Sequence, residues 1–111
     1  MTKQPDRADQ FKALASESRL EILRLLDDPA GNFGHQLSAD PVKTGVCMQM
    51  IAERMGVTQP TISRHIDLLR RAGFLTVTKQ QKWHYCARDE AVLAEYHHWL
   101  GAEMKVKRQA G

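Results

Sequence analysis

The chain has 111 residues, enough for one compact domain with a modest core but too few for a second domain beside it. Hydrophobic residues make up 42% and charged residues 26%, an ordinary globular balance, and the apolar runs are too short to cross a bilayer. We therefore expect a single domain over residues 1–111 and no membrane partner. The first 14 residues lack the apolar stretch of a secretory signal, so we expect the protein in the cytoplasm.

The formal net charge of +3 is distributed unevenly. Residues 58–83 carry a net charge of +4, with Asp67 as their one acid, and the remainder of the chain carries −1. The basic residues of this segment are Arg64, Arg70, Arg71, Lys79 and Lys82. A basic surface on a near-neutral body indicates a polyanionic partner, because neutralising phosphates releases condensed counterions.

Two helices are predicted in the first quarter of the chain. Apolar residues recur at helical spacing over residues 6–15, which predicts the first helix. Ser16 then precedes a strongly periodic leucine-rich run, so we expect it to cap a second helix. That helix should stop before Pro29, because proline interrupts helical hydrogen bonding.

Residues 29–45 are rich in Pro, Gly, Asn and Asp and show no periodicity, which predicts a long loop insertion with at most one short strand. Loops of this length are uncommon inside small domains and are often functional. Regular structure resumes at about Val46, where apolar spacing predicts a short helix. Gly56 is suited to end that helix, because glycine adopts a left-handed backbone conformation without a clash.

A longer helix is predicted from Gln59 to Ala72. Thr58 can cap it, and Pro60 fits its first turn, where a missing backbone donor costs nothing. The apolar residues that share its inward side are Ile62, Ile66 and Leu69. The polar and basic residues are therefore left for the outward sides of the helix.

The region after Gly73 predicts a β-hairpin and a final helix. Two β-rich runs, 74–78 and 82–87, flank a polar tip. The final helix covers about residues 89–107, begins with acids and ends with basic residues, which matches the helix dipole at both ends. Its apolar stripe contains Leu93, Tyr96, Trp99 and Leu100. One small domain has too little surface of its own to pack against such a stripe, so we expect two copies of the chain to pair through it.

The segment MQMIAERMGVTQPTISRHIDLLRRAGFL combines a short amphipathic helix, a glycine turn and a second helix with a polar, basic outer side. This is the layout of a helix-turn-helix, whose second helix enters the major groove of DNA. Gln59 and Thr61 suit base edges or phosphates, Arg64 suits a guanine or a phosphate, and Thr58 and Ser63 suit phosphate oxygens. The alternatives are a solvated helix face and a winged helix that binds protein, and only DNA binding should weaken steeply as salt rises.

Two stretches, FKALASESRLEILRLL and MIAERMGVTQPTISRHIDLLRRAGFLTVTKQQKWHYC, resemble the ArsR/SmtB family of bacterial repressors. The resemblance implies a mainly α fold with a small β-hairpin, a winged helix-turn-helix that forms a homodimer through its first and last helices. It implies a regulator that binds a double-stranded DNA operator and leaves it when an effector arrives. A twofold protein predicts a pseudo-palindromic operator. The DNA contacts that the resemblance implies are Thr58, Gln59, Thr61, Ser63, Arg64 and His65 in the helix and Lys79, Gln80, Gln81 and Lys82 in the wing.

Cys47 and Cys86 are the candidate sensing residues. Members similar to the arsenic sensors carry a Cys-x-Cys pair on the first helix of the helix-turn-helix, but here that pair is broken after Cys47. The motif of the zinc-sensing members is not matched around His97 and His98 either. A metal site needs three or four converging ligands, so we predict neither a metal site nor a cofactor. The thiols are packing residues or, alternatively, a thiol-based redox or metal-responsive switch.

A thiol enzyme is the remaining alternative, with Cys86 and His84 on one face of the predicted strand. Nucleophilic catalysis would need hydrogen-bond contact between this pair and an oxyanion site. The sequence has no Gly-rich loop or orienting acid beside the pair, so we predict that the protein is not an enzyme. The effector is left open between a small molecule bound near residues 29–45 and a redox signal at a thiol.

Overall fold

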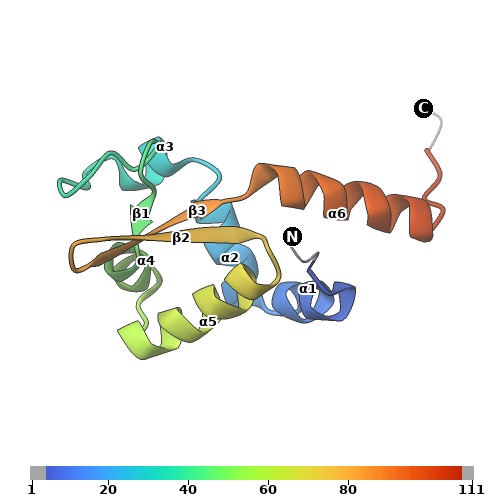
Figure 1. Cartoon of the computed structure of the whole chain (residues 1–111), viewed down its shortest axis with the longest axis horizontal. Coiled ribbons are helices and arrows are strands. Elements are labelled where there is room, and N and C mark those ends of the chain that lie inside the picture. Colours follow the sequence, from blue (N-terminus) through green and yellow to red (C-terminus); the bar gives the residue numbers. More distant parts are fainter. Residues whose placement is uncertain (1–4, 109–111) are drawn as a thin grey trace.

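The computed structural model describes residues 5–108 (Figure 1). In chain order the elements are α1 (Arg7–Leu14), α2 (Glu17–Leu25), α3 (Pro29–Phe33), β1 (Val46–Cys47), α4 (Met48–Met55), α5 (Gln59–Arg71), β2 (Leu75–Gln80), β3 (Trp83–Arg88) and α6 (Glu90–Glu103). The strands form one antiparallel sheet in the order β1-β3-β2. The predicted fold class, mainly α with a small hairpin, is confirmed. Across residues 5–108, each helix is too short or too polar to cross a membrane.

Side-chain caps begin the helices where the sequence predicts. The Ser16 hydroxyl accepts a hydrogen bond from the Arg19 N–H at 3.2 Å and starts α2. The Thr58 hydroxyl accepts from the Thr61 N–H at 3.4 Å and starts α5. These caps satisfy backbone donors that have no partner inside the helix. Gly56 ends α4 as predicted, with a left-handed φ of +68°.

The core is built around α5, which packs against α1, α2, α4 and β2. Its predicted inward residues, Ile62, Ile66 and Leu69, are all fully buried. Removing each of these side chains from water contributes about 1.5–3 kcal/mol. This burial fixes the rotation of α5 about its axis and therefore determines which residues it turns outward.

Residues 29–45 contain a helix that the loop prediction missed. The Asp28 carboxylate accepts from the Gly31 N–H at 3.0 Å and caps α3, with Pro29 in its first turn. A capping Asp followed by Pro is a signal for the start of a helix. The sequence prediction gave more weight to the Gly- and Asn-rich composition and therefore assigned a loop. Phe33 is buried, and the Asn32 side chain donates to the Leu25 carbonyl at 2.9 Å, so the insertion is fastened to the end of α2.

The helix predicted from about Val46 begins at Met48 instead. Val46 and Cys47 form β1, which pairs with the β3 residues Cys86 and Tyr85. Strand propensity depends on the partners that a segment packs against. Local periodicity therefore does not reveal a two-residue strand whose partner lies far along the chain.

The hairpin is longer than predicted and its tip is shorter. Lys79 and Gln80, which were expected in a polar tip over residues 79–82, belong to β2 and pair with His84 and Trp83 of β3. Only residues 81–82 connect the strands. The cross-strand pairs continue through polar side chains, whereas the sequence prediction ended the first strand where the polar residues begin.

The last helix ends at Glu103, short of the predicted boundary near residue 107. Lys105 has a left-handed φ of +50°, and the Val106 N–H donates back to the Gly101 carbonyl at 2.9 Å. This bond, together with the bond from the Lys105 N–H to the Ala102 carbonyl at 3.2 Å, closes the helix in the pattern of a Schellman motif. The basic residues expected in the last turn therefore lie beyond the end of the helix.

Most of α6 extends away from the rest of the domain (Figure 1). Its Tyr96 is buried against Phe74, with ring centroids 5.2 Å apart. Phe11 of α1 contacts Tyr96 and Trp99 at centroid distances of 6.0 and 5.8 Å but is itself 45% exposed. The apolar stripe of α6 is therefore only partly covered by its own chain.

Candidate nucleic-acid interface

A glycine turn joins the two helices that form the centre of the interface. Gly56 ends α4, and the next residue, Val57, donates its N–H to the Ala52 carbonyl at 3.0 Å. This bond closes the last turn of α4 and lets the chain change direction. The Thr58 hydroxyl then caps α5 and donates to Thr61 Oγ1 at 3.0 Å. The start of α5 is therefore held in a fixed position relative to α4.

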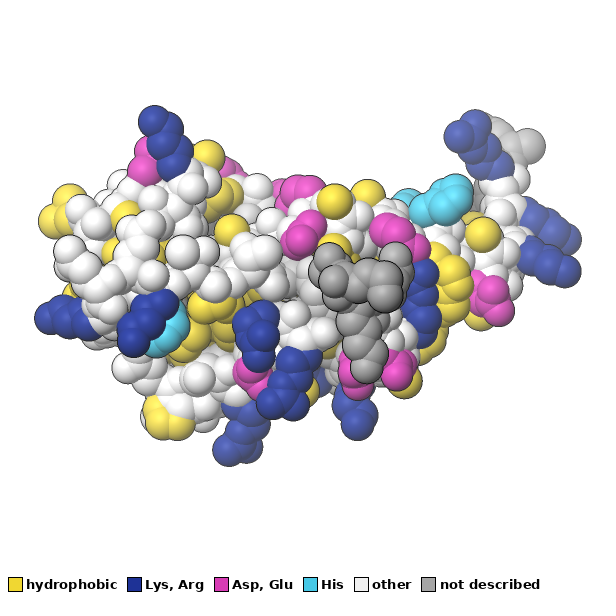
Figure 2. Space-filling model, viewed as in Figure 1, with side chains coloured by type: hydrophobic (Ala, Val, Ile, Leu, Met, Phe, Trp, Pro, Cys, Tyr) yellow, Lys and Arg dark blue, Asp and Glu magenta, His cyan; other side chains and the backbone are white. Residues whose placement is uncertain are grey.

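The first half of α5 presents polar side chains to solvent. Gln59, Thr61, Ser63 and Arg64 are exposed, as the inward position of the three core residues requires. Figure 2 shows Lys and Arg side chains along the lower edge of the molecule, where Figure 1 places α5, and at the end of the hairpin. The free N–H groups and the dipole at the start of α5 add to the attraction for anions.

His65 differs from the other predicted contacts because it is partly buried. Its Nδ1 lies 3.1 Å from an Arg19 Nη atom, which comes from α2. Burial of the ring is the main cause that lowers the pKa of His65, and the positive charges of Arg19 and Arg64 lower it further. The ring therefore stands as a neutral imidazole at the border between the outward side of α5 and the α1–α2 side.

The basic residues of α5 and the hairpin are not equivalent. Arg70 and Arg71 both bind the Asp67 carboxylate, at 2.8 and 2.9 Å, so the one acid of this segment offsets part of their charge. The basic residues of α5 and the hairpin that form no salt bridge within residues 5–108 are Arg64, Lys79 and Lys82. Within α5 and the hairpin, these three side chains are the cations that an approaching polyanion can contact without breaking a salt bridge.

The hairpin forms a polar wing beside α5. Its predicted contact residues, Lys79, Gln80, Gln81 and Lys82, are all exposed. The Lys82 ammonium lies 5.2 Å from the Trp83 ring centroid, which is a cation–π distance. His84 is exposed and pairs directly with Lys79, so both side chains project from one face of the hairpin. Sequence reasoning considered His84 only beside Cys86, although pairing the two strands about a two-residue turn at residues 81–82 places His84 opposite Lys79 in the wing.

Both candidate sensing cysteines are buried free thiols. Cys47 lies opposite Tyr85 and Cys86 lies opposite Val46, so the two thiols are on opposite faces of the sheet and poorly placed for a mutual disulfide. Burial is the main cause that raises the pKa of Cys86 to about 12, and the electrostatic interaction with the nearby Cys47 raises it further. The reactive thiolate of Cys86 is therefore scarce at neutral pH.

Metal-ligating side chains do not gather in the described part of the chain. Among residues 5–108, no group of three or more His, Cys, Asp or Glu side chains is placed to hold a metal ion. The exposed His84 and the fully buried Cys86 differ sharply in their access to solvent. Within residues 5–108, the Cys86 thiol and the His84 imidazole therefore do not share a site that is open to substrate.

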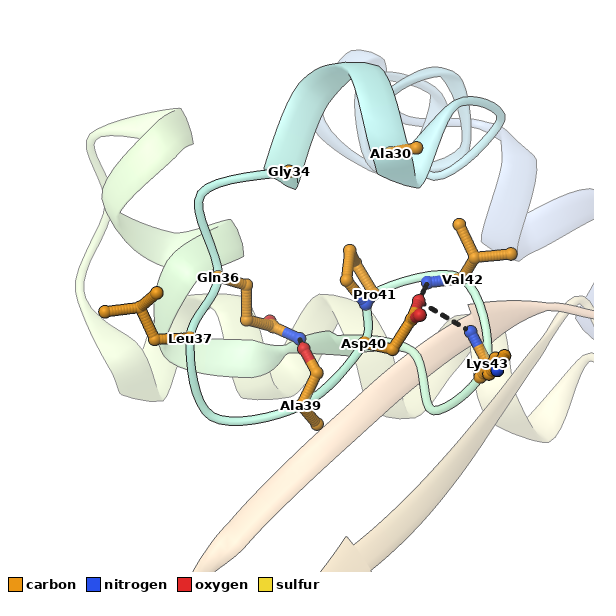
Figure 3. A pocket seen from close by; sticks show the side chains of 9 residues that line it. All are labelled: Ala30, Gly34, Gln36, Leu37, Ala39, Asp40, Pro41, Val42 and Lys43. Carbon is orange, nitrogen blue, oxygen red and sulfur yellow. Dashed lines mark hydrogen bonds between the residues drawn. The ribbon is translucent and has the colours of Figure 1, made fainter.

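An open groove of about 570 Å³ lies within the insertion, between α3 and the turn that follows it (Figure 3). Ala30 lines it from α3, and Pro41 and Val42 line it from the turn. The Asp40 carboxylate accepts from the N–H groups of Lys43 and Val42, which lower its pKa. Because this carboxylate is already engaged by the backbone, the groove offers mainly apolar contacts.

Gln36 fixes the insertion to the sheet. Its Nε2 donates to the carbonyls of Ala39 and Gly45, at 2.9 and 3.0 Å, and its Oε1 accepts from the Cys47 N–H at 2.8 Å. The side chain is buried, so these bonds satisfy polar groups that water does not reach. The groove and β1 therefore share one polar anchor.

An exposed polar and basic helix, placed after a glycine turn and followed by a basic hairpin, defines a winged helix-turn-helix DNA-binding domain. A protein-family model described as a helix-turn-helix domain matches residues 50–78 of the chain. The chain is 35% identical over 94 residues to the uncharacterised HTH-type transcriptional regulator YbzH of Bacillus subtilis, covering 85% of this chain and 94% of that protein.

Two further similarities agree. The chain is 38% identical over 76 residues to the arsenical resistance operon repressor of Escherichia coli, covering 68% of this chain and 53% of that repressor. Its fold matches the homodimeric winged helix-turn-helix domain Mb0332 of Mycobacterium bovis, a possible ArsR-family regulator, with a TM-score of 0.57, 21% identity and coverage of 100% and 98%. The chain belongs to the ArsR family of winged helix-turn-helix transcriptional regulators.

Proposed function

We propose that the protein is a homodimeric repressor that binds a pseudo-palindromic operator in the cytoplasm and has no enzymatic activity. The observation that carries this proposal is the exposed first half of α5, where Arg64 has no salt bridge in residues 5–108 and lies on the same chain segment as the basic wing. The proposed DNA contacts are Thr58, Gln59, Thr61, Ser63, Arg64 and His65 in α5 and its cap, and Lys79, Gln80, Gln81 and Lys82 in the wing.

The proposed homodimer covers the apolar side of α1 and α6. Phe11 and Met104 are 45% and 61% exposed, and Trp99 and Leu100 are only partly buried. A second copy would bury these side chains by twofold symmetry, because the same surface meets itself in such an interface. The homodimeric state of the similar Mycobacterium bovis domain supports this arrangement.

Repression is supported by the similarity to the arsenical resistance operon repressor of Escherichia coli, and we propose that binding of an effector ends it. Between the two kinds of effector considered, we favour a small molecule over oxidation of a thiol. Cys47 and Cys86 are both buried, and the pKa of Cys86 is raised, which slows attack on an oxidant. The groove between α3 and the following turn is the concave surface that we propose for such a molecule.

The test is fluorescence anisotropy of the protein titrated onto DNA from upstream of its own gene, at several salt concentrations. We expect tight binding whose logarithm falls linearly with the logarithm of salt concentration. Arg64→Ala should weaken binding by about tenfold or more, which corresponds to about 1.4 kcal/mol. Arg24→Ala is the matched control, because Arg24 is an exposed arginine on α2 that pairs with Glu21.

Binding that resists salt, or that Arg64→Ala leaves unchanged, would contradict the DNA interface. Sedimentation equilibrium of the same samples tests the dimer independently. A monomer at micromolar concentration would contradict the proposed pairing of α1 and α6.

A further inference from the structure

Arg19 connects three helices through one side chain. Its Nε donates to the Ala13 carbonyl at 2.7 Å and one Nη donates to the Lys12 carbonyl at 3.0 Å. Both carbonyls lie in the last turn of α1, where the Lys12 carbonyl also accepts a long bond from the Ala15 N–H at 3.3 Å. The other Nη lies 3.1 Å from Nδ1 of His65 on α5. Two acceptors on α1 therefore hold the guanidinium that meets the imidazole.

The chemistry of this contact fixes the hydrogen on His65. A guanidinium is always charged and only donates, so Nδ1 must be the acceptor. In a neutral imidazole the hydrogen then resides on Nε2. An imidazolium would carry hydrogens on both nitrogens and could not accept from Arg19. The charged groups that act on this ring, Arg19 and Arg64, are both cations and favour the neutral form.

The second ring nitrogen is available for an outside partner. Nε2 makes no hydrogen bond within residues 5–108, and no buried side-chain nitrogen or oxygen there lacks a partner. Nε2 therefore contacts solvent. His65 lies one turn after the exposed Thr61 on α5, in the half of the helix assigned to DNA.

We propose that Arg19 is a positioning residue that holds His65 in the tautomer with its hydrogen on Nε2, so that α5 presents a fixed hydrogen-bond donor to an acceptor atom of DNA. This inference rests on the DNA interface of the proposed function. We place the effect of Arg19 on DNA binding in the His65 ring, because the described hydrogen bonds of Arg19 all go to α1 and α5. A free imidazole exchanges between tautomers, whereas this ring meets DNA with one donor already in place.

The first test is long-range ¹H–¹⁵N NMR of the wild-type protein without DNA. The His65 signals, assigned from their loss in His65→Gln, should show an unprotonated Nδ1 and a protonated Nε2. Arg19→Met, which keeps the alkyl chain but removes the donors, should give a mixture of tautomers. Arg24→Met removes a guanidinium from the same helix and should leave the His65 spectrum unchanged.

The second test is a double-mutant cycle of operator affinity. His65→Ala should weaken binding by about fivefold to tenfold, the effect of one hydrogen bond. Arg19→Met should weaken it by only about twofold, because about half of the rings in a mixture of tautomers still carry the donor. The double variant should bind no more weakly than His65→Ala, because Arg19 acts on DNA binding only through the His65 ring. Losses that multiply would overturn the proposal.

The wild-type spectrum decides the matter even if Arg19→Met does not fold. A hydrogen on Nδ1, or equal populations of both tautomers, overturns the role of Arg19 and leaves the proposed function intact. A protonated His65 in the DNA complex overturns it as well, since that ring cannot accept from Arg19. Failure of the wild-type protein to bind the operator is a different result, which overturns the proposed function itself.

Discussion

The Gln36→Met substitution probes how firmly the insertion is held to the domain. Met has nearly the length of Gln but cannot make its three hydrogen bonds. Two of these bonds, from the Cys47 N–H and to the Gly45 carbonyl, are buried, while the bond to Ala39 is partly buried. The substitution therefore leaves at least two buried backbone groups without a partner.

Each buried donor or acceptor left unsatisfied costs about 1–3 kcal/mol. Two such groups give a loss of roughly 2–6 kcal/mol in the free energy of unfolding. Local opening of residues 36–47 limits this loss, because it lets water reach the same groups. We therefore expect a value near the lower end, about 2–3 kcal/mol, together with faster amide hydrogen exchange in β1.

Urea denaturation followed by tryptophan fluorescence measures the change, and hydrogen exchange locates it. Gln49→Met is the matched control, because Gln49 is exposed on α4 and its replacement should change the stability by less than about 0.5 kcal/mol. A loss in Gln36→Met as small as that of the control would refute the anchoring role of Gln36. Uniformly faster exchange, without a focus on β1, would refute the local opening.

Three other outcomes follow from the structure. Because the pKa of Cys86 is raised to about 12, only about one Cys86 thiol in ten thousand is ionised at pH 8. Alkylation of Cys86 in the native protein, followed by mass spectrometry, should therefore be slow. Rapid labelling without denaturant would contradict the burial of this thiol. The lowered pKa of His65 means that the unfolded chain takes up the proton first, so the free energy of unfolding should fall as pH drops from about 6.5 towards the native value. Urea titrations of wild type and His65→Gln at both ends of that range check this, and equal pH dependence would count against it. Gly56→Ala should cost about 1 kcal/mol through its φ of +68° alone, whereas Gly45→Ala should cost more because the added Cβ would lie 2.8 Å from the Cys86 carbonyl oxygen. Thermal melts that show the reverse order would contradict the close approach of Gly45 to β3.

The sequence predicts α5 well because independent local signals coincide there. Thr58 marks its start, Pro60 is tolerated only in the first turn, and the spacing of Ile62 and Ile66 gives its buried side. Once that side is known, the outward position of Arg64 follows from helix geometry. The part of the site that we propose to face DNA can therefore be predicted with little tertiary information.

Elements that depend on distant partners could not be placed in the same way. β1 exists because Val46 pairs with Cys86 on a strand that comes much later in the chain. The position of Arg19 is a second case, because periodicity gives the buried side of α2 but not how α2 crosses α1 and α5. His65 was consequently expected among freely exposed contacts, although its ring is partly buried against that arginine.

Polar contacts join α1 to both the proposed dimer helix and the proposed recognition helix. Arg7 binds the Glu95 carboxylate of α6 through two hydrogen bonds, at 2.9 and 2.7 Å. The fully buried Gln10 donates to the Ala72 carbonyl at the end of α5, at 3.2 Å. A dimer rearrangement that shifts α1 must break or rebuild these bonds, and an unpartnered buried amide is costly. In the proposed homodimer, the free energy of placing α5 on DNA therefore depends on how the two copies pair, so the proposed effector would release the operator without contacting α5 if it changed that pairing.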